Sequence, residues 1–224
     1  MEDVSTISQI ITGLNGGNVP ALDMIYTLTL VALLPSIVIM MTSFVRIIII
    51  LSFTRNALGV QNTPPNIVLT GMALFLTLFI MSPTLSDIRT EAYEPYKSGE
   101  ITQEEAITRS VEPMKEFMLK NTEQNTLNKF VSMAHQKKLD NPKDYSLTII
   151  TPAFMTSELK RGFMAGFLIY LPFLLIDVVV ATTLMSMGMA MMPPTMVSMP
   201  FKLLLFVSVD GWNLLFSTLI NSFR

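Results

Sequence analysis

Four long stretches of this 224-residue chain are almost free of charge, and they constrain its fold more than any other feature. The first lies between Asp23 and Arg46 and continues into IIIILSF, and the second runs from Asn56 to Ser86. The third is GFLIYLPFLLIDVVVATTLM, and the fourth is TMVSMPFKLLLFVSVDGWNLLFSTLI. A helix that crosses a bilayer needs about 20 mainly apolar residues. Each stretch is therefore a candidate membrane span, although charges interrupt the third and the fourth.

The charged residues are concentrated in one part of the chain. Only 14% of all residues are charged, whereas a soluble domain carries roughly 25%. Of the 32 charged residues, 23 lie between Asp87 and Arg161. We therefore expect three parts: an N-terminal segment with two apolar helical runs (1–86), a charged helical domain (87–161), and two apolar runs joined by a methionine-rich turn (162–224).

The composition argues against several classes of function. The chain has no cysteine, so disulfides, thiolate catalysis and cysteine-based metal sites are excluded. A net charge of −2 gives no electrostatic case for nucleic-acid binding. His135 is the only histidine and has no ligand partners at metal-site spacing, and Glu104 and Glu105 form a pair typical of a solvated helix face. With no phosphate loop, nucleophile elbow or dinucleotide fingerprint, we expect no enzyme and no cofactor.

The charged middle region has the patterns of amphipathic helices. Thr102 with Glu105 three positions later forms a capping-box pattern. One helical face is expected to contain Ile107, Val111, Met114 and Met118. A second, shorter helix should bury Leu127, Phe130, Val131 and Ala134. Thr151 and Pro152 are the expected start of a long helix that enters the third apolar run. No strand pattern and no internal repeat is visible, so the predicted class is all-α.

Prolines and glycines indicate that the apolar helices pack against protein. A proline inside a helix removes one backbone hydrogen bond and favours a kink, and such breaks persist at membrane depth where neighbouring protein satisfies the backbone. Pro35 lies in the first run, Pro172 in the third and Pro200 in the fourth. Gly162 and Gly166 are four residues apart at the start of the third run, a spacing that permits close approach of another helix.

The distribution of basic residues predicts an orientation in the membrane. Arg46 and Arg55, between the first two runs, are expected on the cytoplasmic side. The acidic N-terminus and the charged middle region would then face outward, the methionine-rich turn would return to the cytoplasmic side, and Arg224 would lie outside. Met1 is followed by Glu2 and Asp3, so no signal peptide is visible in this sequence.

Four ionisable residues lie within the apolar runs and are candidates for buried charge pairing: Arg46, Asp177, Lys202 and Asp210. Each is costly in hydrocarbon, at about 2.5 to 3.5 kcal/mol in the centre of an isolated helix. One interpretation is that they lie near the membrane surface and extend toward water. The other is that they pair across helix contacts, with Asp177 as the natural partner of Lys202. Lys202 and Asp210, eight residues apart, could share one face of a continuous helix.

The turn between the last two apolar runs is unusually rich in methionine. MSMGMAMMPPTMVSMP, residues 185–200, contains seven methionines in sixteen positions. The alternation of Met185, Met187, Met189 and Met191 follows a two-residue step, which differs from the step of a helix face. A copper site is disfavoured because no histidine or cysteine lies nearby and copper carriers usually repeat their methionine motifs. Ordinary buried packing stays open as an interpretation.

Several of these segments together resemble the FliP/SctR family of type III secretion export-gate proteins. The most specific are QNTPPN, SELKRGF, FLIYLPFLLID and PFKLLLFVSVDGW, and the resemblance covers most of the chain beyond the first twenty residues. LSFTRNALGVQNTPPN and LMSMGM are closer to the flagellar branch than to the virulence branch. Members usually start with a cleaved signal peptide, which this sequence does not show, and Ala190 interrupts a methionine series that is often continuous.

The resemblance implies a ring of five copies that forms an export gate with FliQ and FliR subunits. This gate lies in the bacterial inner membrane at the flagellar basal body, contacts other membrane proteins of the export apparatus, and passes unfolded flagellar proteins. The family's apolar helices form steep hairpins in a complex raised largely out of the bilayer plane.

The resemblance also suggests a role for the methionine-rich turn. In the family the matching loop is described as a gasket around the pore, which makes Met185, Met187, Met189, Met191 and Met192 candidate pore-sealing residues. Methionine is flexible enough to repack around varied shapes, and an apolar constriction can close a pore by dewetting.

Two other functions are carried as alternatives: a virulence export-gate subunit, and a self-contained ion or solute transporter that uses Asp177, Lys202 and Asp210. Transporters commonly contain internal repeats around a midplane site, and none is seen here. The mass of the purified assembly distinguishes a pentamer or a mixed complex from a monomer or dimer.

Overall fold

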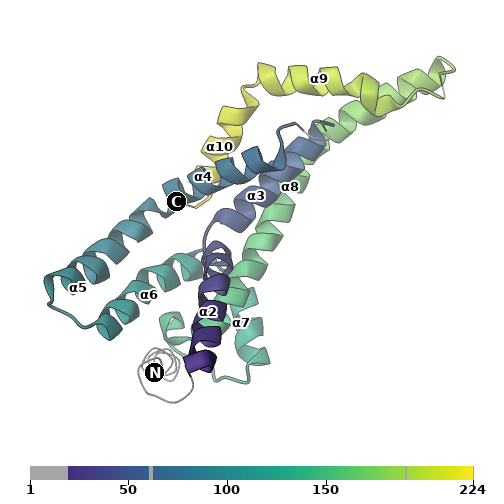
Figure 1. Cartoon of the computed structure of the whole chain (residues 1–224). Helices are drawn as coiled ribbons and strands as arrows, with labels where there is room; N and C mark the ends of the chain where they lie inside the picture. The colour runs from purple at the N-terminus through teal and green to yellow at the C-terminus, as the bar shows by residue number, and fades with distance from the viewer. Residues whose placement is uncertain (1–19, 61–62, 190, 224) are drawn as a thin grey trace. The chain divides into compact units, whose positions relative to one another are not determined.

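The computed structural model describes residues 20–60, 63–189 and 191–223, and every regular element in these ranges is helical (Figure 1). The α-helices are α2 (Pro20–Met40), α3 (Phe44–Ala57), α4 (Asn66–Ile88), α5 (Glu94–Ser98), α6 (Gln103–Lys120), α7 (Gln124–Met133), α8 (Leu147–Ser186), α9 (Pro194–Ser208) and α10 (Gly211–Asn221). A π-helical turn, η1 (Arg89–Tyr93), joins α4 to α5, and a 3₁₀ turn, η2 (Pro142–Asp144), precedes α8. The predicted all-α class is confirmed for the described residues.

The chain divides into two compact units. One consists of Met1–Thr42 and Met81–Ser157, and the other of Ser43–Ile80 and Glu158–Arg224. Helices α4 and α8 each contribute residues to both units. The division into parts at residues 86 and 161 that we expected from charge density stays a prediction.

The first unit contains the amphipathic helices predicted for the charged region. The capping box at the start of α6 is present, because the Thr102 hydroxyl accepts from the Glu105 amide at 3.3 Å and the Glu105 carboxylate accepts from the Thr102 amide at 3.1 Å. Met118, on the predicted face of α6, is fully buried. Its neighbour Phe117 packs edge-on against Phe154 of α8, with ring centroids 5.9 Å apart.

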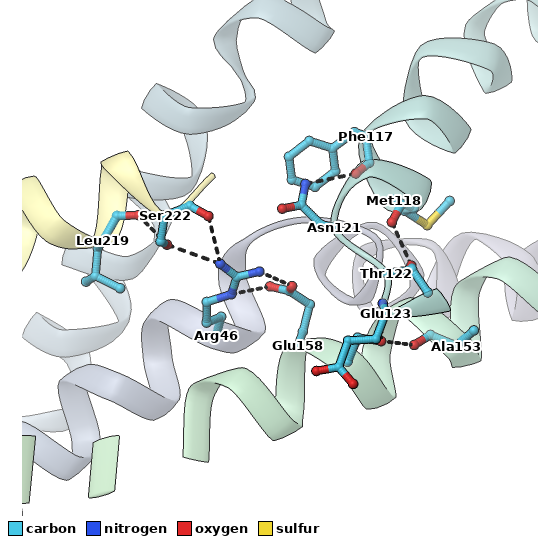
Figure 2. A network of polar contacts seen from close by, with 11 residues as sticks. Arg46, Phe117, Met118, Asn121, Thr122, Glu123, Ala153, Glu158, Leu219 and Ser222 are labelled. Atoms are coloured by element: carbon cyan, nitrogen blue, oxygen red, sulfur yellow. Dashed lines mark hydrogen bonds and ion pairs between the residues drawn. The ribbon is translucent and has the colours of Figure 1, made fainter. Parts of the chain in front are cut away.

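The turn between α6 and α7 is fixed by side-chain hydrogen bonds within the same unit (Figure 2). The Asn121 side chain donates to the Phe117 carbonyl at 2.9 Å, and the Thr122 hydroxyl donates to the Met118 carbonyl at 2.7 Å. Leu127 and Val131 of α7 are buried, as predicted, whereas Phe130 is only half-buried. Ala134 is exposed instead, because it is the C-cap residue that ends α7 and no longer lies on the helical face.

Helix α8 begins earlier than Thr151 and Pro152 predicted. Ser146 precedes the helix, and its hydroxyl accepts from the Thr148 amide at 3.1 Å. Its carbonyl accepts from the amides of both Ile149 and Ile150 at 3.0 Å. A serine in this position satisfies amides that the first helical turn leaves free, so the helix starts at Leu147 and Pro152 falls in its second turn.

The first apolar stretch is two helices, which corrects its interpretation as one span. Pro35 lies inside α2, and the helix continues to Met40. The chain leaves the helix over residues 41–43, where the Thr42 hydroxyl donates to the Ile39 carbonyl at 2.9 Å. Helix α3 then starts at Phe44 and has only 14 residues, about 21 Å of length, which is too short for the hydrocarbon core.

Two described helices are long and apolar enough to cross a membrane: the 33-residue helix Asn66–Ser98, which includes η1 and α5, and the 40-residue α8. These correspond to the second and third apolar stretches, which is the expected result. The fourth stretch is α9 and α10, which are bent by 62° relative to each other and count as a third span only if taken as one. The bend lies after Ser208, not at Pro200, which stays inside α9.

Candidate functional site

The methionine-rich turn starts where a glycine ends α8. The Met189 amide donates to the Leu184 carbonyl at 3.0 Å, and the Gly188 amide donates to the Met185 carbonyl at 3.1 Å. These two bonds form a Schellman motif. Gly188 has φ of 78°, a left-handed conformation that glycine adopts without steric cost. The sequence therefore stops α8 at Ser186 and directs the chain out of the helix.

The candidate seal residues lie on both sides of this glycine and are mostly exposed in the subunit. Met185 lies in the last turn of α8, and Met191 is fully exposed. Met189 is the least exposed of the group, at 37%. The remaining members, Met187 and Met192, are also exposed. A large exposed apolar patch marks a site of contact with another protein or with a membrane.

Two helices form the stem of this turn, and a buried ion pair joins them. Lys202 of α9 donates from Nζ to Asp177 Oδ2 of α8 at 2.6 Å. Ser198, one helical turn before Lys202, donates from its hydroxyl to Asp177 Oδ1 at 2.5 Å. Both carboxylate oxygens are therefore occupied by donors from α9. The structure brings together the two residues that we expected to pair, and it adds Ser198, which the sequence analysis missed.

The Lys202 ammonium lies close to Gly59, which belongs to the connection between α3 and α4. Its side chain is only 3% exposed, and the Asp177 side chain is 20% exposed. A Cβ atom built on Gly59 would lie 4.0 Å from Lys202 Nζ and 4.0 Å from Met199 Cγ. The same unit contains an apolar cluster of Ala57, Leu58, Phe173 and Phe206, in which Phe173 is one helical turn before Asp177 and Phe206 one turn after Lys202. The pair is thus held in a closed, largely apolar environment.

Asp210 does not join this pair, which corrects the idea that it shares a helix face with Lys202. Helix α9 ends at Ser208, and Asp210 has φ of 50° in the bend before α10. Its carboxylate accepts a hydrogen bond from the Asn213 side chain at 3.2 Å. The bend is closely packed, because a Cβ atom at Gly211 would lie 2.4 Å from the Phe206 ring, so this position admits only glycine without a shift of the ring.

Arg46 forms a second buried charge site in the same unit (Figure 2). Its guanidinium donates through Nε to Glu158 Oε2 at 2.9 Å and through Nη2 to Glu158 Oε1. Its Nη1 donates to the Ser222 carbonyl at 3.3 Å and to the Ser222 hydroxyl at 3.1 Å. The Arg46 Cζ atom also lies 3.8 Å from the centre of the Phe223 ring. Arg46 therefore connects α3, α8 and the end of α10.

Glu158 is the partner that the sequence analysis did not identify. It is fully buried, and it lies in SELKRGF beside Lys160 and Arg161, where we assigned it to the charged middle region. A buried arginine with a two-pronged carboxylate partner is the strongest geometry for such a pair. The usable signal was that Arg46 lies within an apolar run and needs an acidic partner, and Glu158 is the acidic residue at the entry to the third run.

The glycine pair of α8 lies against α3, as its spacing suggested. A Cβ atom at Gly162 would lie 3.3 Å from Ile49, and one at Gly166 would lie 2.6 Å from Phe53. Phe53 also packs edge-on against Phe163, with ring centroids 5.6 Å apart. The absence of a side chain at Gly166 is therefore what lets the two helices approach this closely.

His135 has a structural position at the end of α7. Its φ is 52°, and the following amide, that of Gln136, donates to the Val131 carbonyl at 3.2 Å. It is thus the left-handed residue that closes a helix, a role that histidine fills less often than glycine or asparagine. Across the residues that the structure describes, no group of three or more histidine, aspartate and glutamate side chains could hold a metal ion.

Comparison with known proteins places these features in a family. A model of the FliP family matches residues 27–219. The chain is 53% identical over 196 residues to the flagellar biosynthetic protein FliP of Bacillus subtilis (strain 168), which covers 88% of this chain and 89% of that protein. It is 48% identical over 211 residues to the protein of the same name from Pectobacterium carotovorum subsp. carotovorum (93% and 82%). For Aquifex aeolicus (strain VF5) the identity is 44% over 211 residues (93% and 88%).

Proposed function

The chain belongs to the FliP family and is a membrane-embedded component of the flagellar export apparatus, and we propose that it forms the protein-conducting pore of that apparatus with FliQ and FliR. In this proposal five copies make a ring in the bacterial inner membrane at the flagellar basal body. Unfolded flagellar proteins pass through the centre of the ring. Further membrane proteins of the export apparatus surround it.

The observation that carries the proposal is the exposed methionine-rich turn on a stem fixed by buried charges. Met191 is fully exposed, while Asp177 and Lys202 join α8 to α9 below the turn. In a ring, the exposed methionines of several copies would meet and form an apolar constriction, which excludes water and ions. Because methionine is unbranched and flexible, the same constriction can repack around the varied side chains of a passing chain.

The buried charges suit a structural role better than ion transport. Lys202 is 3% exposed at its side chain and is neutralised by Asp177. Arg46 is 3% exposed and engages Glu158 and Ser222 through three of its nitrogens. A transporter needs ionisable groups that face a water-filled path and can change partners. These observations favour the export-gate proposal over the alternative of a self-contained transporter.

The flagellar relatives favour export of flagellar proteins over a virulence role. The three proteins compared above share the name flagellar biosynthetic protein FliP and are 44% to 53% identical to this chain. A motility assay in the native cell tests whether the exported proteins are flagellar. Deleting the gene should abolish flagella, and restoring it should recover swimming.

The assembly is tested by mass. We expect native mass spectrometry of the purified chain, produced together with FliQ and FliR, to show five copies in each complex. The same preparation in liposomes should be closed to ions, since the methionine-rich turns seal the pore. A monomer or dimer with no affinity for FliQ or FliR would overturn the proposal and favour the transporter alternative.

A further inference from the structure

Ser198 makes a contact that the buried ion pair does not need for charge neutralisation. Its hydroxyl donates to Asp177 Oδ1 at 2.5 Å, while Lys202 donates to the other oxygen, Oδ2, at 2.6 Å. Ser198 is fully buried, so its hydroxyl has no water as an alternative acceptor. The nearest other acceptor is the Thr195 carbonyl at 3.3 Å, and a hydroxyl carries only one proton. The short bond to Asp177 therefore uses that proton.

The two donors restrain α9 to different degrees. The ammonium of Lys202 is a point charge at the end of a flexible four-carbon stem, and it can follow a shift of the helix without losing its partner. The hydroxyl of Ser198 is one bond from Cβ and reaches Asp177 in a single helix position. The lysine thus supplies attraction between α8 and α9, whereas the serine fixes where α9 lies along α8.

The first two turns of α9 depend on this contact more than ordinary helical turns would. Pro200 has no amide hydrogen, so the bond from residue 200 to the Met196 carbonyl is absent from the turn that contains Ser198. Helix α9 starts at Pro194, directly after Pro193, and Met192 precedes both. A proline pair is stiff, so the position of Ser198 is passed on to the end of the methionine-rich turn.

We propose that Ser198 is a positioning residue of the gate: through Asp177 it holds the start of α9, and with it the methionine-rich turn, in the closed position. This inference rests on the proposed function, because a seal must exist for its position to matter. It predicts that removing the hydroxyl loosens the seal while the ion pair continues to hold the hairpin together.

The test compares Ser198→Ala with Ser208→Ala in complete gates containing FliQ and FliR. Ser208 lies on the same helix, is exposed, and donates only to the Leu205 carbonyl at 2.9 Å. Ion conductance through gates in liposomes is one readout. The second is the maleimide labelling rate of a thiol introduced as Met191→Cys, the only cysteine of this chain, in gates whose FliQ and FliR subunits carry no cysteine.

With Ser198→Ala we expect conductance and labelling to rise about tenfold, the ratio given by losing one hydrogen bond to a charged group. The amount of assembled gate should stay close to the parent value and its melting temperature should fall by only about 2 to 6 °C, while Ser208→Ala should match the parent in every measurement. Ser198→Thr keeps the hydroxyl and should give a gate as tight as the parent gate. A leaking Ser198→Thr gate together with a tight Ser198→Ala gate would count against the inference.

Three results would overturn it. Tight Ser198→Ala gates, with leaking gates when the methionines are changed to alanine, would remove the role of Ser198 and leave the seal intact. If the methionine variants were also tight, the seal itself would be wrong. A fall in assembled Ser198→Ala gates, with normal conductance per remaining gate, would make Ser198 a residue of general stability only.

Discussion

Arg46 and Glu158 are 112 positions apart in the sequence and form a two-pronged ion pair in which both side chains are buried. The pair joins α3 to α8, and a third guanidinium nitrogen, Nη1, donates to the carbonyl and the hydroxyl of Ser222. A guanidinium out of water is tolerated only when its donors are satisfied. The same network of hydrogen bonds therefore also holds Ser222, the residue directly after α10.

Glu158→Gln should destabilise the subunit by about 3 to 5 kcal/mol, because it leaves the Arg46 charge buried without a counter-charge. Thermal unfolding in detergent, followed by circular dichroism, measures the effect. Replacing both residues by methionine should recover much of the loss, since a buried pair is often no more stable than apolar groups of similar volume.

The matched control is the exposed pair of Glu116 and Lys143, whose Nζ–Oε2 distance is 3.0 Å and whose side chains are 66% and 46% exposed. Glu116→Gln should cost about 0 to 1 kcal/mol. Equal losses from Glu158→Gln and Glu116→Gln would contradict the view that burial sets the value of these pairs.

Gly166→Ala should destabilise the contact of α3 with α8 by about 1 to 3 kcal/mol, the usual cost of overpacking. Its new Cβ atom would lie 2.6 Å from the Phe53 side chain. Gly162→Ala is the comparison, since its Cβ would lie 3.3 Å from Ile49 and alanine favours a helix by about 1 kcal/mol over glycine. We expect the melting temperature to fall for Gly166→Ala and to change little for Gly162→Ala.

A compensating change tests the cause of the Gly166 effect. Phe53→Ala removes Cγ and the rest of the ring, which the new methyl group would meet at 2.6 Å, so the double variant with Gly166→Ala should be more stable than the two separate losses predict. Additive losses would show that the ring at position 53 is not what limits the space at Gly166.

The sequence predicts the parts of the fold that depend on long, uniform patterns. Helices α4 and α8 follow from the length of their apolar runs, and the start of α6 follows from Thr102 and Glu105. The breaks are harder to predict, because the prolines inside the apolar runs do not mark them. Helix α2 passes through Pro35 and ends at Met40. Helix α9 passes through Pro200, and the bend lies after its end, where the Phe206 ring packs against Gly211.

The candidate site was predictable to a similar extent. Asp177 and Lys202 stand out because opposite charges in neighbouring apolar runs have few other partners. Glu158 and Ser198 were missed for different reasons: Glu158 lies in a charged segment that looks solvated, and a serine in an apolar helix carries no signal of its own. Asp210 has the same apolar surroundings as Lys202, but the bend of 62° between α9 and α10 separates their roles.

Removing Asp177 should cost more stability than removing Lys202. Asp177→Asn leaves the Lys202 ammonium, 3% exposed, without a counter-charge, and should cost about 3 to 5 kcal/mol. Lys202→Met leaves the Asp177 carboxylate, which is 20% exposed and still accepts a hydrogen bond from Ser198. The loss of stability caused by Lys202→Met should therefore be smaller. Exchanging the two residues, Asp177→Lys with Lys202→Asp, should restore part of the loss. Melting temperature and the yield of assembled gate measure each variant, and a swap no better than its worse parent would argue against pairing as the source of stability.

The methionines should seal the pore by their volume and ease passage by their flexibility, and two sets of substitutions separate these properties. Changing Met187, Met189, Met191 and Met192 to alanine shortens the constriction, so gates that still assemble should leak ions. Changing the same four to leucine keeps an apolar constriction but removes the unbranched chain that repacks around different side chains. Leucine gates should therefore stay tight and export more slowly. Membrane conductance and swimming are measured on the same strains. If alanine gates are present in normal amount and stay tight, the cluster is ordinary packing. If leucine gates export at the parental rate, flexibility is not what passage requires.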